Sequence, residues 1–173
     1  MDALIEIEAI RQLKARYCRL LDLKDWSAWR ELFTEDFISD TSESGGPRLQ
    51  GADEFVAFVR DTLGAPRRTT VHMVHAPEIE LLSETAARGI WMLEDLIRFA
   101  PGLGFRGHGH YHETYKKQDG RWVIASSRLT RLREDIVTPF FSLQVSGWLR
   151  RQSIKAGQRH SAAWLEKRRR ASR

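Results

Sequence analysis

Cysteine is almost absent from this 173-residue chain, which contains only Cys18. One cysteine cannot form a disulfide within the chain, so nothing points to an oxidising compartment and we expect a cytoplasmic protein. Long apolar runs are also missing, because no stretch approaches the roughly 18 residues that a membrane-spanning helix requires. The first ten residues, MDALIEIEAI, contain acidic and no basic side chains, so we do not expect a signal peptide.

Several motifs that identify enzyme chemistry are absent as well. The chain has no P-loop, no G-x-S-x-G and no C-x-x-C sequence, and its one G-x-G-x-x-G match, GLGFRG at 102–107, leads into the predicted hairpin strand and not into a helix, as a dinucleotide site would need. There is therefore no sequence signal for a nucleotide cofactor, a serine hydrolase or a redox-active dithiol. We expect a protein that works without a cofactor.

Positive charge is concentrated in one segment. The net charge is +5, but residues 155–173 contain seven Lys and Arg residues and a single acid, Glu166. That segment has an excess of six positive charges, so the rest of the chain stands at about −1. Because no basic face extends over the remainder, we expect no nucleic-acid partner.

Helical and strand patterns occupy different parts of the chain. Apolar residues at spacings of three and four predict helices at about 3–23, 26–33 and 51–63. After the break at Gly64-Ala65-Pro66, alternating residues predict strands at 69–73, 78–82 and 85–99. Helices followed by long antiparallel strands predict an α+β fold in one domain.

The stretch 104–133 predicts a long hairpin. Asp119-Gly120 supplies the positive backbone angles that a tight turn needs. On the first arm, Phe105, Tyr111 and Tyr115 alternate with a row of three histidines, His108, His110 and His112. On the second arm, Trp122, Ile124, Ser126 and Arg128 alternate with Val123, Ala125, Ser127 and Leu129.

The strand at 85–99 contains an unusual carboxylate. One face of it is apolar except for Asp95, while the opposite face places Glu94 among arginines. Burying a lone carboxylate costs several kcal/mol unless the group is paired or its pKa rises. Asp95 is therefore a candidate site residue, and we expect it to point into the interior with Glu94 outside.

The hairpin sequence GHYHETYKKQDGRWVIASSRL resembles the last hairpin of the SnoaL-like branch of the nuclear transport factor 2-like superfamily, which includes scytalone dehydratase and bile-acid 7α-dehydratase. The resemblance extends from about Ile7 to about Arg133. It implies a cone-shaped, curved antiparallel sheet with three N-terminal helices enclosing one pocket, within residues 1–137. Residues 138–173 would form an extension, first helical and then basic and mobile beyond Ala156. A small hydrophobic substrate and a homodimer or homotrimer are also expected.

The resemblance assigns roles to particular residues. Members of this branch use an aspartate at the end of the first helix to orient a histidine on the sheet, and a nearby tyrosine polarises the substrate. The matching residues are Asp22, His72 and Tyr17. A further carboxylate matches Asp95, a second histidine matches His110 or alternatively His108, and a final-strand arginine matches Arg128.

The expected chemistry is proton removal by a neutral imidazole. Asp22 would orient and stabilise the imidazolium of His72, inside walls formed by Trp26, Phe55, Trp91 and Tyr111. This favours a cofactor-independent lyase (dehydratase) or isomerase acting on a hydrophobic cyclic, steroid-like or polyketide-like substrate.

Two other interpretations remain open at this stage. His108, His110 and His112 have a metal-ligand spacing typical of a hydrolase, although the outer pair would lie about 13 Å apart along a strand. The same fold also serves as a ligand-binding or assembly module without catalysis. In that case Asp22 would be a surface residue that ends a helix, and His72 would be structural.

Overall fold

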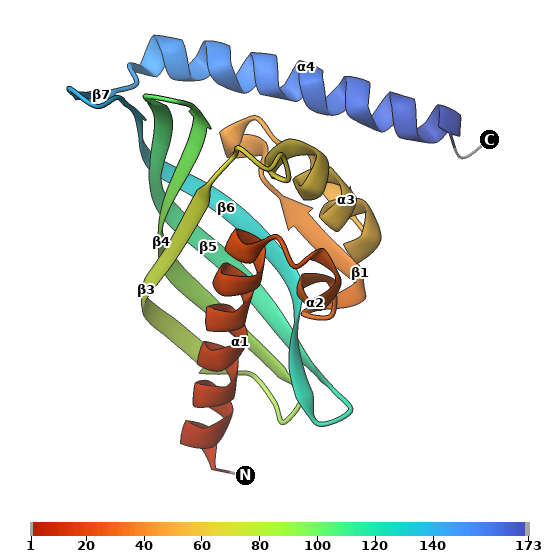
Figure 1. Cartoon of the computed structure of the whole chain (residues 1–173). Coiled ribbons are helices and arrows are strands. Elements are labelled where there is room, and N and C mark those ends of the chain that lie inside the picture. The colour runs from red at the N-terminus through yellow and green to blue at the C-terminus, as the bar shows by residue number, and fades with distance from the viewer. Residues whose placement is uncertain (1, 172–173) are drawn as a thin grey trace.

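The computed structural model describes residues 2–171, which form a curved sheet with helices packed against it (Figure 1). Seven strands make up the sheet: β1 (Phe33–Asp40), β2 (Arg48–Gln50), β3 (Thr70–Leu81), β4 (Ala86–Ala100), β5 (Leu103–Gln118), β6 (Arg121–Val137) and β7 (Ser142–Gln144). Their order is β2-β1-β6-β5-β4-β3, with β7 added beside β6. The predicted α+β cone is confirmed.

One strand pairing differs from the expected antiparallel sheet. β1 runs parallel to β6, whereas the other neighbouring strands are antiparallel. Residues 41–120 separate these two strands, so no hairpin turn between them marks their relative direction in the sequence. The sheet is therefore mixed.

Three helices lie on one face of this sheet (Figure 1): α1 (Ala3–Leu23), α2 (Trp26–Arg30) and α3 (Ala52–Leu63). The Asp2 side chain accepts a hydrogen bond from the Leu4 amide, and Asp25 caps α2 through the Ala28 amide. The buried stripe of α1 includes Ile10, Leu13, Tyr17 and Leu21, at the predicted helical spacing.

The two short strands predicted around Pro77 form one strand, β3, with an irregularity in the middle. The register with β4 shifts between His75 and Glu78, and Ala76 has a positive φ of 40°. Proline lacks the N–H that a regular ladder would use, so the bulge accommodates it without ending the strand.

Two bulges in β6 change which side chains face the helices. Thr114 pairs with Ser126 while Tyr115 pairs with Ile124, so Ala125 is an extra residue. Leu132 is extra in the same way, between the residues opposite Gly109 and His108. Each bulge reverses the alternation, so the predicted faces of the second hairpin arm are wrong beyond Ile124.

The last helix, α4 (Gly147–Ala171), crosses one end of the sheet and extends over α3 (Figure 1). The chain beyond Ala156, expected to be weakly ordered, is thus helical as far as Ala171. Trp164 anchors it, because its ring lies 5.2 Å from that of Phe58 and its Nε1 donates to Asp61 at 2.9 Å. The helix is rich in basic side chains, and the contacts of Trp164 hold it against α3.

A close backbone contact also seats α4. Gly157 packs against Gly45, which follows the short 3-10 turn η1 (Ser42–Ser44), and a β-carbon at Gly157 would meet the Gly45 backbone at 2.7 Å. Beside this contact, the buried Ser161 donates a hydrogen bond to the Gly45 carbonyl at 3.2 Å. Among residues 2–171, the longest helices all lack the sustained apolar stretch that crossing a membrane would need.

Candidate active site

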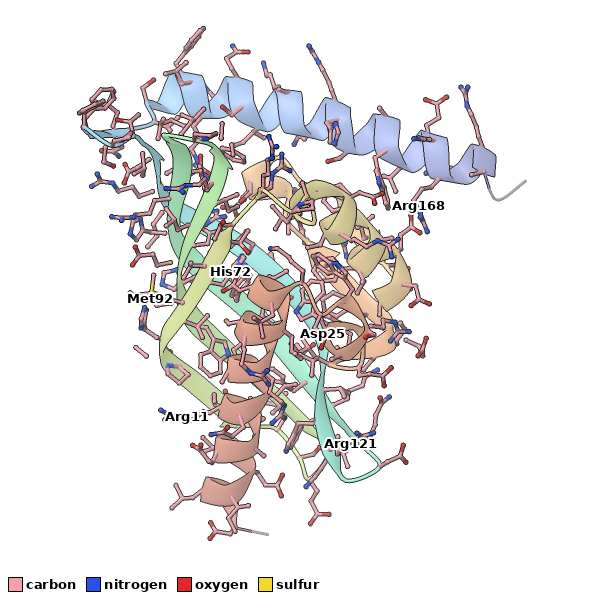
Figure 2. The ribbon with its side chains drawn as sticks, viewed as in Figure 1. Arg11, Asp25, His72, Met92, Arg121 and Arg168 are labelled. Carbon is pink, nitrogen blue, oxygen red and sulfur yellow. The ribbon has the colours of Figure 1, made fainter. Side chains whose placement is uncertain are left out.

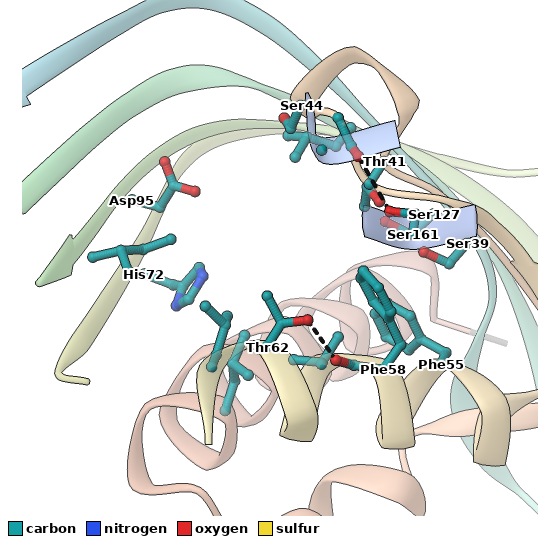
Figure 3. A pocket seen from close by; sticks show the side chains of 18 of the residues that line it. Ser39, Thr41, Ser44, Phe55, Phe58, Thr62, His72, Asp95, Ser127 and Ser161 are labelled. Atoms are coloured by element: carbon teal, nitrogen blue, oxygen red, sulfur yellow. Dashed lines mark hydrogen bonds between the residues drawn. The ribbon is translucent and has the colours of Figure 1, made fainter. Parts of the chain in front are cut away.

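A cavity of about 270 Å³ lies between the sheet, α1, α3 and α4. Its walls are mostly apolar and aromatic, with Trp29, Phe55, Phe58, Ile97 and Leu129 among them. His72 and Asp95 are at one side in Figure 3, and a group of serine and threonine side chains is at the other. Residues from α4 complete the wall.

Asp22 and His72 form the expected pair. Nδ1 of His72 lies 2.7 Å from Oδ1 of Asp22, and the His72 side chain is 5% exposed. A carboxylate at this distance accepts from an N–H, so the neutral imidazole is protonated on Nδ1 and carries its lone pair on Nε2. The imidazole is therefore arranged to accept a proton.

Further hydrogen bonds hold the Asp22 carboxylate. Its Oδ2 accepts the backbone N–H of His72 at 2.8 Å, and its Oδ1 accepts the Thr70 hydroxyl at 2.8 Å. Lys24, just past the end of α1, donates to the Thr70 oxygen at 2.6 Å. These bonds connect the helix end to the first residues of β3, which fixes the orientation of the pair.

Asp95 points into the cavity, as predicted, but it has a partner that the sequence did not reveal. Arg131 binds it with two parallel bonds of 2.7 and 2.6 Å, and both side chains are 4% exposed. A third bond joins Nε of Arg131 to Ser44 at 2.9 Å. Glu94 faces outward, where it pairs with Arg106 at 3.4 Å.

Gly107 makes room for this ion pair. Asp95 is on β4 and Arg131 on β6, so the pair must pass over β5, which lies between them. The residues of β5 at that place are Gly107, opposite Asp95, and Gly109, opposite Arg131. A β-carbon at Gly107 would overlap both the Asp95 carboxylate and the Arg131 guanidinium. The glycines of the GHGH sequence thus lie on the inner side of β5, while its histidines lie on the outer side.

Tyr17 and Tyr111 form part of the cavity wall, with ring centroids 6.0 Å apart. Burial raises the pKa of both phenols, so they remain neutral O–H groups. Behind them, the ammonium group of Lys14 lies 4.0 Å from the Tyr17 ring centroid and 3.8 Å from that of Tyr111. Lys14 also pairs with Glu113 at 2.6 Å, and both of these side chains are 0% exposed.

Cys18, next to Tyr17, gives a direct test of this packing. Burial raises the pKa of its thiol to about 11, and the thiolate is the reactive form. We therefore expect the native protein at pH 8 to react with Ellman's reagent far more slowly than the protein unfolded in urea. Equal rates in the two states would show that the face of α1 that carries Cys18 is not buried as described.

Four of the predicted site residues lie elsewhere. His110 is on the outer face, where it pairs in register with Met92, which projects from the sheet in Figure 2. Arg128 is exposed on that face, because the bulge at Ala125 reverses the alternation that placed it inside. Trp91 is buried in the core and donates to Tyr115 at 2.7 Å, and Trp26 packs on the Trp29 ring, so neither lines the cavity.

The histidine row has no metal-binding arrangement in this structure. His108 lies 3.8 Å from Glu94, and His112 lies 3.2 Å from Thr130. Within residues 2–171, no three His, Cys, Asp or Glu side chains are grouped closely enough to hold a metal ion. The three histidines lie along the outer face of β5, away from the Asp22–His72 pair.

Three important site residues were missed from the sequence. Arg131 was hidden by the bulge at Ala125, although Gly107 was a usable signal of space on the inner face. Lys14 was an ordinary charge on an amphipathic helix, and its partner Glu113 is 99 positions away. Ser161 lies in a polar segment with no pattern that indicates a cavity.

Comparisons with known proteins agree with this architecture. The family model of the SnoaL-like domain matches residues 2–128. "Probable cyclase FGR4" of Gibberella zeae is 24% identical over 135 residues, which cover 71% of this chain and 89% of that protein. Two solved structures share the fold. A "Putative Scytalone Dehydratase" from Novosphingobium aromaticivorans has a TM-score of 0.69 at 23% identity, covering 76% of this chain and 87% of that one. Hexachlorocyclohexane dehydrochlorinase LinA-type3 from Novosphingobium barchaimii has a TM-score of 0.67 at 16% identity, and the match covers 84% of this chain and 94% of that one.

Proposed function

Because this chain belongs to the SnoaL-like branch of the nuclear transport factor 2-like superfamily, we propose that it is a cofactor-independent lyase or isomerase with His72 as the base. One observation carries the proposal: a buried histidine oriented by a half-buried carboxylate faces an apolar cavity. The names of the similar proteins denote a cyclase, a dehydratase and a dehydrochlorinase, which supports elimination or ring chemistry.

The first step of the proposed reaction is proton removal next to a carbonyl group. Nε2 of His72 takes the proton, and the electrons of the C–H bond move to the carbonyl to form an enolate. Asp22 stabilises the imidazolium, because its charge lies 2.7 Å from the opposite ring nitrogen. No group outside the chain needs to accept electrons.

The enolate oxygen would be stabilised by donors already in the cavity wall. Arg131 has five N–H groups, and the hydrogen bonds described for it from the guanidinium use three of them, two to Asp95 and one to Ser44. Among the described residues, no hydrogen bond uses the other two N–H groups of Arg131. The neutral phenols of Tyr17 and Tyr111 lie on the same wall. Donors held in place before the reaction lower its barrier most effectively.

Two outcomes can follow from the same enolate. If a hydroxyl group is attached β to the carbonyl, it leaves with the proton from His72, and the products are water and an unsaturated ketone. If the substrate has a neighbouring double bond, His72 returns the proton to another carbon and the double bond moves. The aromatic walls suit a cyclic, steroid-like or polyketide-like compound in either case.

The proposal can be tested with two defined compounds. We expect turnover of 3-hydroxy-1-tetralone to 1-naphthol by dehydration, or of androst-5-ene-3,17-dione to its conjugated isomer. Prior treatment with EDTA and 1,10-phenanthroline should leave the rate unchanged, because the proposed base is an imidazole. Loss of activity after chelation would favour the metal hydrolase interpretation, and binding without turnover of either compound would favour a ligand-binding module.

A further inference from the structure

We propose that Thr41, Ser127 and Ser161 form a subsite that accepts a hydrogen bond from a hydroxyl group of the substrate. This inference rests on the proposed function, because it concerns the substrate of the proposed reaction. It adds the substrate class, which is a cyclic ketone with a hydroxyl group distant from the carbonyl. All three side chains line the cavity, on the side opposite His72 and Asp95 in Figure 3.

The three residues come from distant parts of the chain but meet at one place. Ser127 on β6 follows Ser126, and its partner in the parallel register is Ser39 of β1. Thr41 comes two residues later, directly after β1. Ser161 reaches the same wall from α4, where it contacts Gly45 in the loop that follows Thr41.

The direction of the three hydrogen bonds is determined by their partners. Thr41 donates to the carbonyl of Pro47 at 3.2 Å, and Ser161 donates to the carbonyl of Gly45 at 3.2 Å. Ser127 donates to the carboxylate of Glu113 at 3.1 Å. A carbonyl or a carboxylate can only accept, so each hydroxyl proton is directed into the protein.

This leaves the cavity with oxygen lone pairs at that wall. A hydroxyl oxygen carries two lone pairs, so each of the three can still accept a hydrogen bond after its proton is engaged. The wall therefore suits a donor, such as a phenol or alcohol O–H. It does not suit a carboxylate or an ether oxygen, because neither has a proton to donate to the three hydroxyl oxygens.

The two ends of the cavity thus differ in hydrogen-bonding character. Near Asp95, Arg131 offers N–H donors, and Ser44 accepts from Arg131 while keeping its own proton. At the opposite side, Thr41, Ser127 and Ser161 offer acceptors. A ligand with a carbonyl at one end and a hydroxyl at the other satisfies both sides in one orientation.

The test measures binding and needs no turnover. The probes are 6-hydroxy-1-tetralone, 6-methoxy-1-tetralone and 1-tetralone, none of which has a β-hydroxyl group to eliminate. We expect calorimetry to show that the hydroxy compound binds the full-length protein about tenfold more tightly than the methoxy compound, as one well-placed hydrogen bond would give. Equal affinities for these two probes would overturn the proposal.

Substitutions locate the effect. In Ser161→Ala and in Thr41→Val, the hydroxy compound should lose most of its advantage, while the methoxy compound and 1-tetralone bind as before. The matched control is Ser153→Ala, on the exposed side of the same helix, where the hydroxyl donates to the Leu149 carbonyl. That variant should behave as wild type.

Two further results separate the possible explanations. If Ser161→Ala and Thr41→Val weaken all three probes equally, the residues only hold α4 and its loop in place, and the proposed subsite is wrong. In His72→Ala the preference for the hydroxy probe should persist, because the base is not part of the subsite. A failure of the proposed reaction would therefore leave this result unaffected.

Discussion

Replacing His72 with alanine is expected to lower turnover by about 10²- to 10⁴-fold, the usual contribution of a positioned general base. The loss should appear in kcat, because the aromatic walls that bind the substrate are unchanged. Asp22→Asn is expected to cause a loss of similar order, since an amide keeps the shape of the side chain but cannot stabilise the imidazolium. Steady-state kinetics with either tetralone or steroid substrate would measure both effects.

His110→Ala is the matched control for the His72 variant. His110 is a half-buried histidine on another strand of the same sheet, and it faces the outer side. Its replacement should leave kcat unchanged. If His72→Ala retained full activity, or if His110→Ala removed it, the proposed mechanism would be wrong.

Replacing Lys14 with methionine is expected to destabilise the fold by about 3–5 kcal/mol. The change leaves the Glu113 carboxylate buried, with hydrogen bonds from Tyr115 and Ser127 but without a counter-charge. It also removes the ammonium group from the faces of the Tyr17 and Tyr111 rings. Since whole domains are stable by only about 5–15 kcal/mol, urea denaturation should show a large shift of the midpoint.

Two variants identify the cause of that loss. The double change Lys14→Met with Glu113→Gln should recover most of the stability, because no uncompensated buried charge remains. Lys116→Met is the control, as Lys116 is 53% exposed and its pairing with Asp36 at 3.5 Å is worth little. A loss in Lys116→Met as large as in Lys14→Met would contradict the assignment to burial.

Residue alternation was a reliable guide where the strand is regular. β4 pairs with β5 without a shift from Ala86 to Arg98, and Asp95 and Glu94 face the two sides that a period of two requires. The Asp22–His72 pair was also predicted, because family resemblance supplied the contact that local pattern cannot. The placement of Asp95 thus depends on a regular repeat, and that of the Asp22–His72 pair depends on the resemblance.

Alternation failed where a strand gains a residue. Ala125 and Leu132 carry no mark that distinguishes a bulged residue from a paired one, yet Ala125 reverses the side chains that follow it until Leu132 reverses them again. The reversal removed Arg128 from the cavity and brought in Arg131. The Lys14–Glu113 pair was not predictable either, because the sequence does not show which charges become partners across 99 positions.

The position of α4 has a consequence for how this protein diverges from its relatives. The family match ends at residue 128, whereas the contacts that seat α4 begin at Arg150 and those that place Ser161 at the cavity lie further along the same helix. The proposed base and its orienting carboxylate thus lie in the shared part, and a share of the substrate wall lies in a segment that can change independently. Chains that match the family over the first 128 residues can therefore still differ in the part of the cavity wall that α4 supplies.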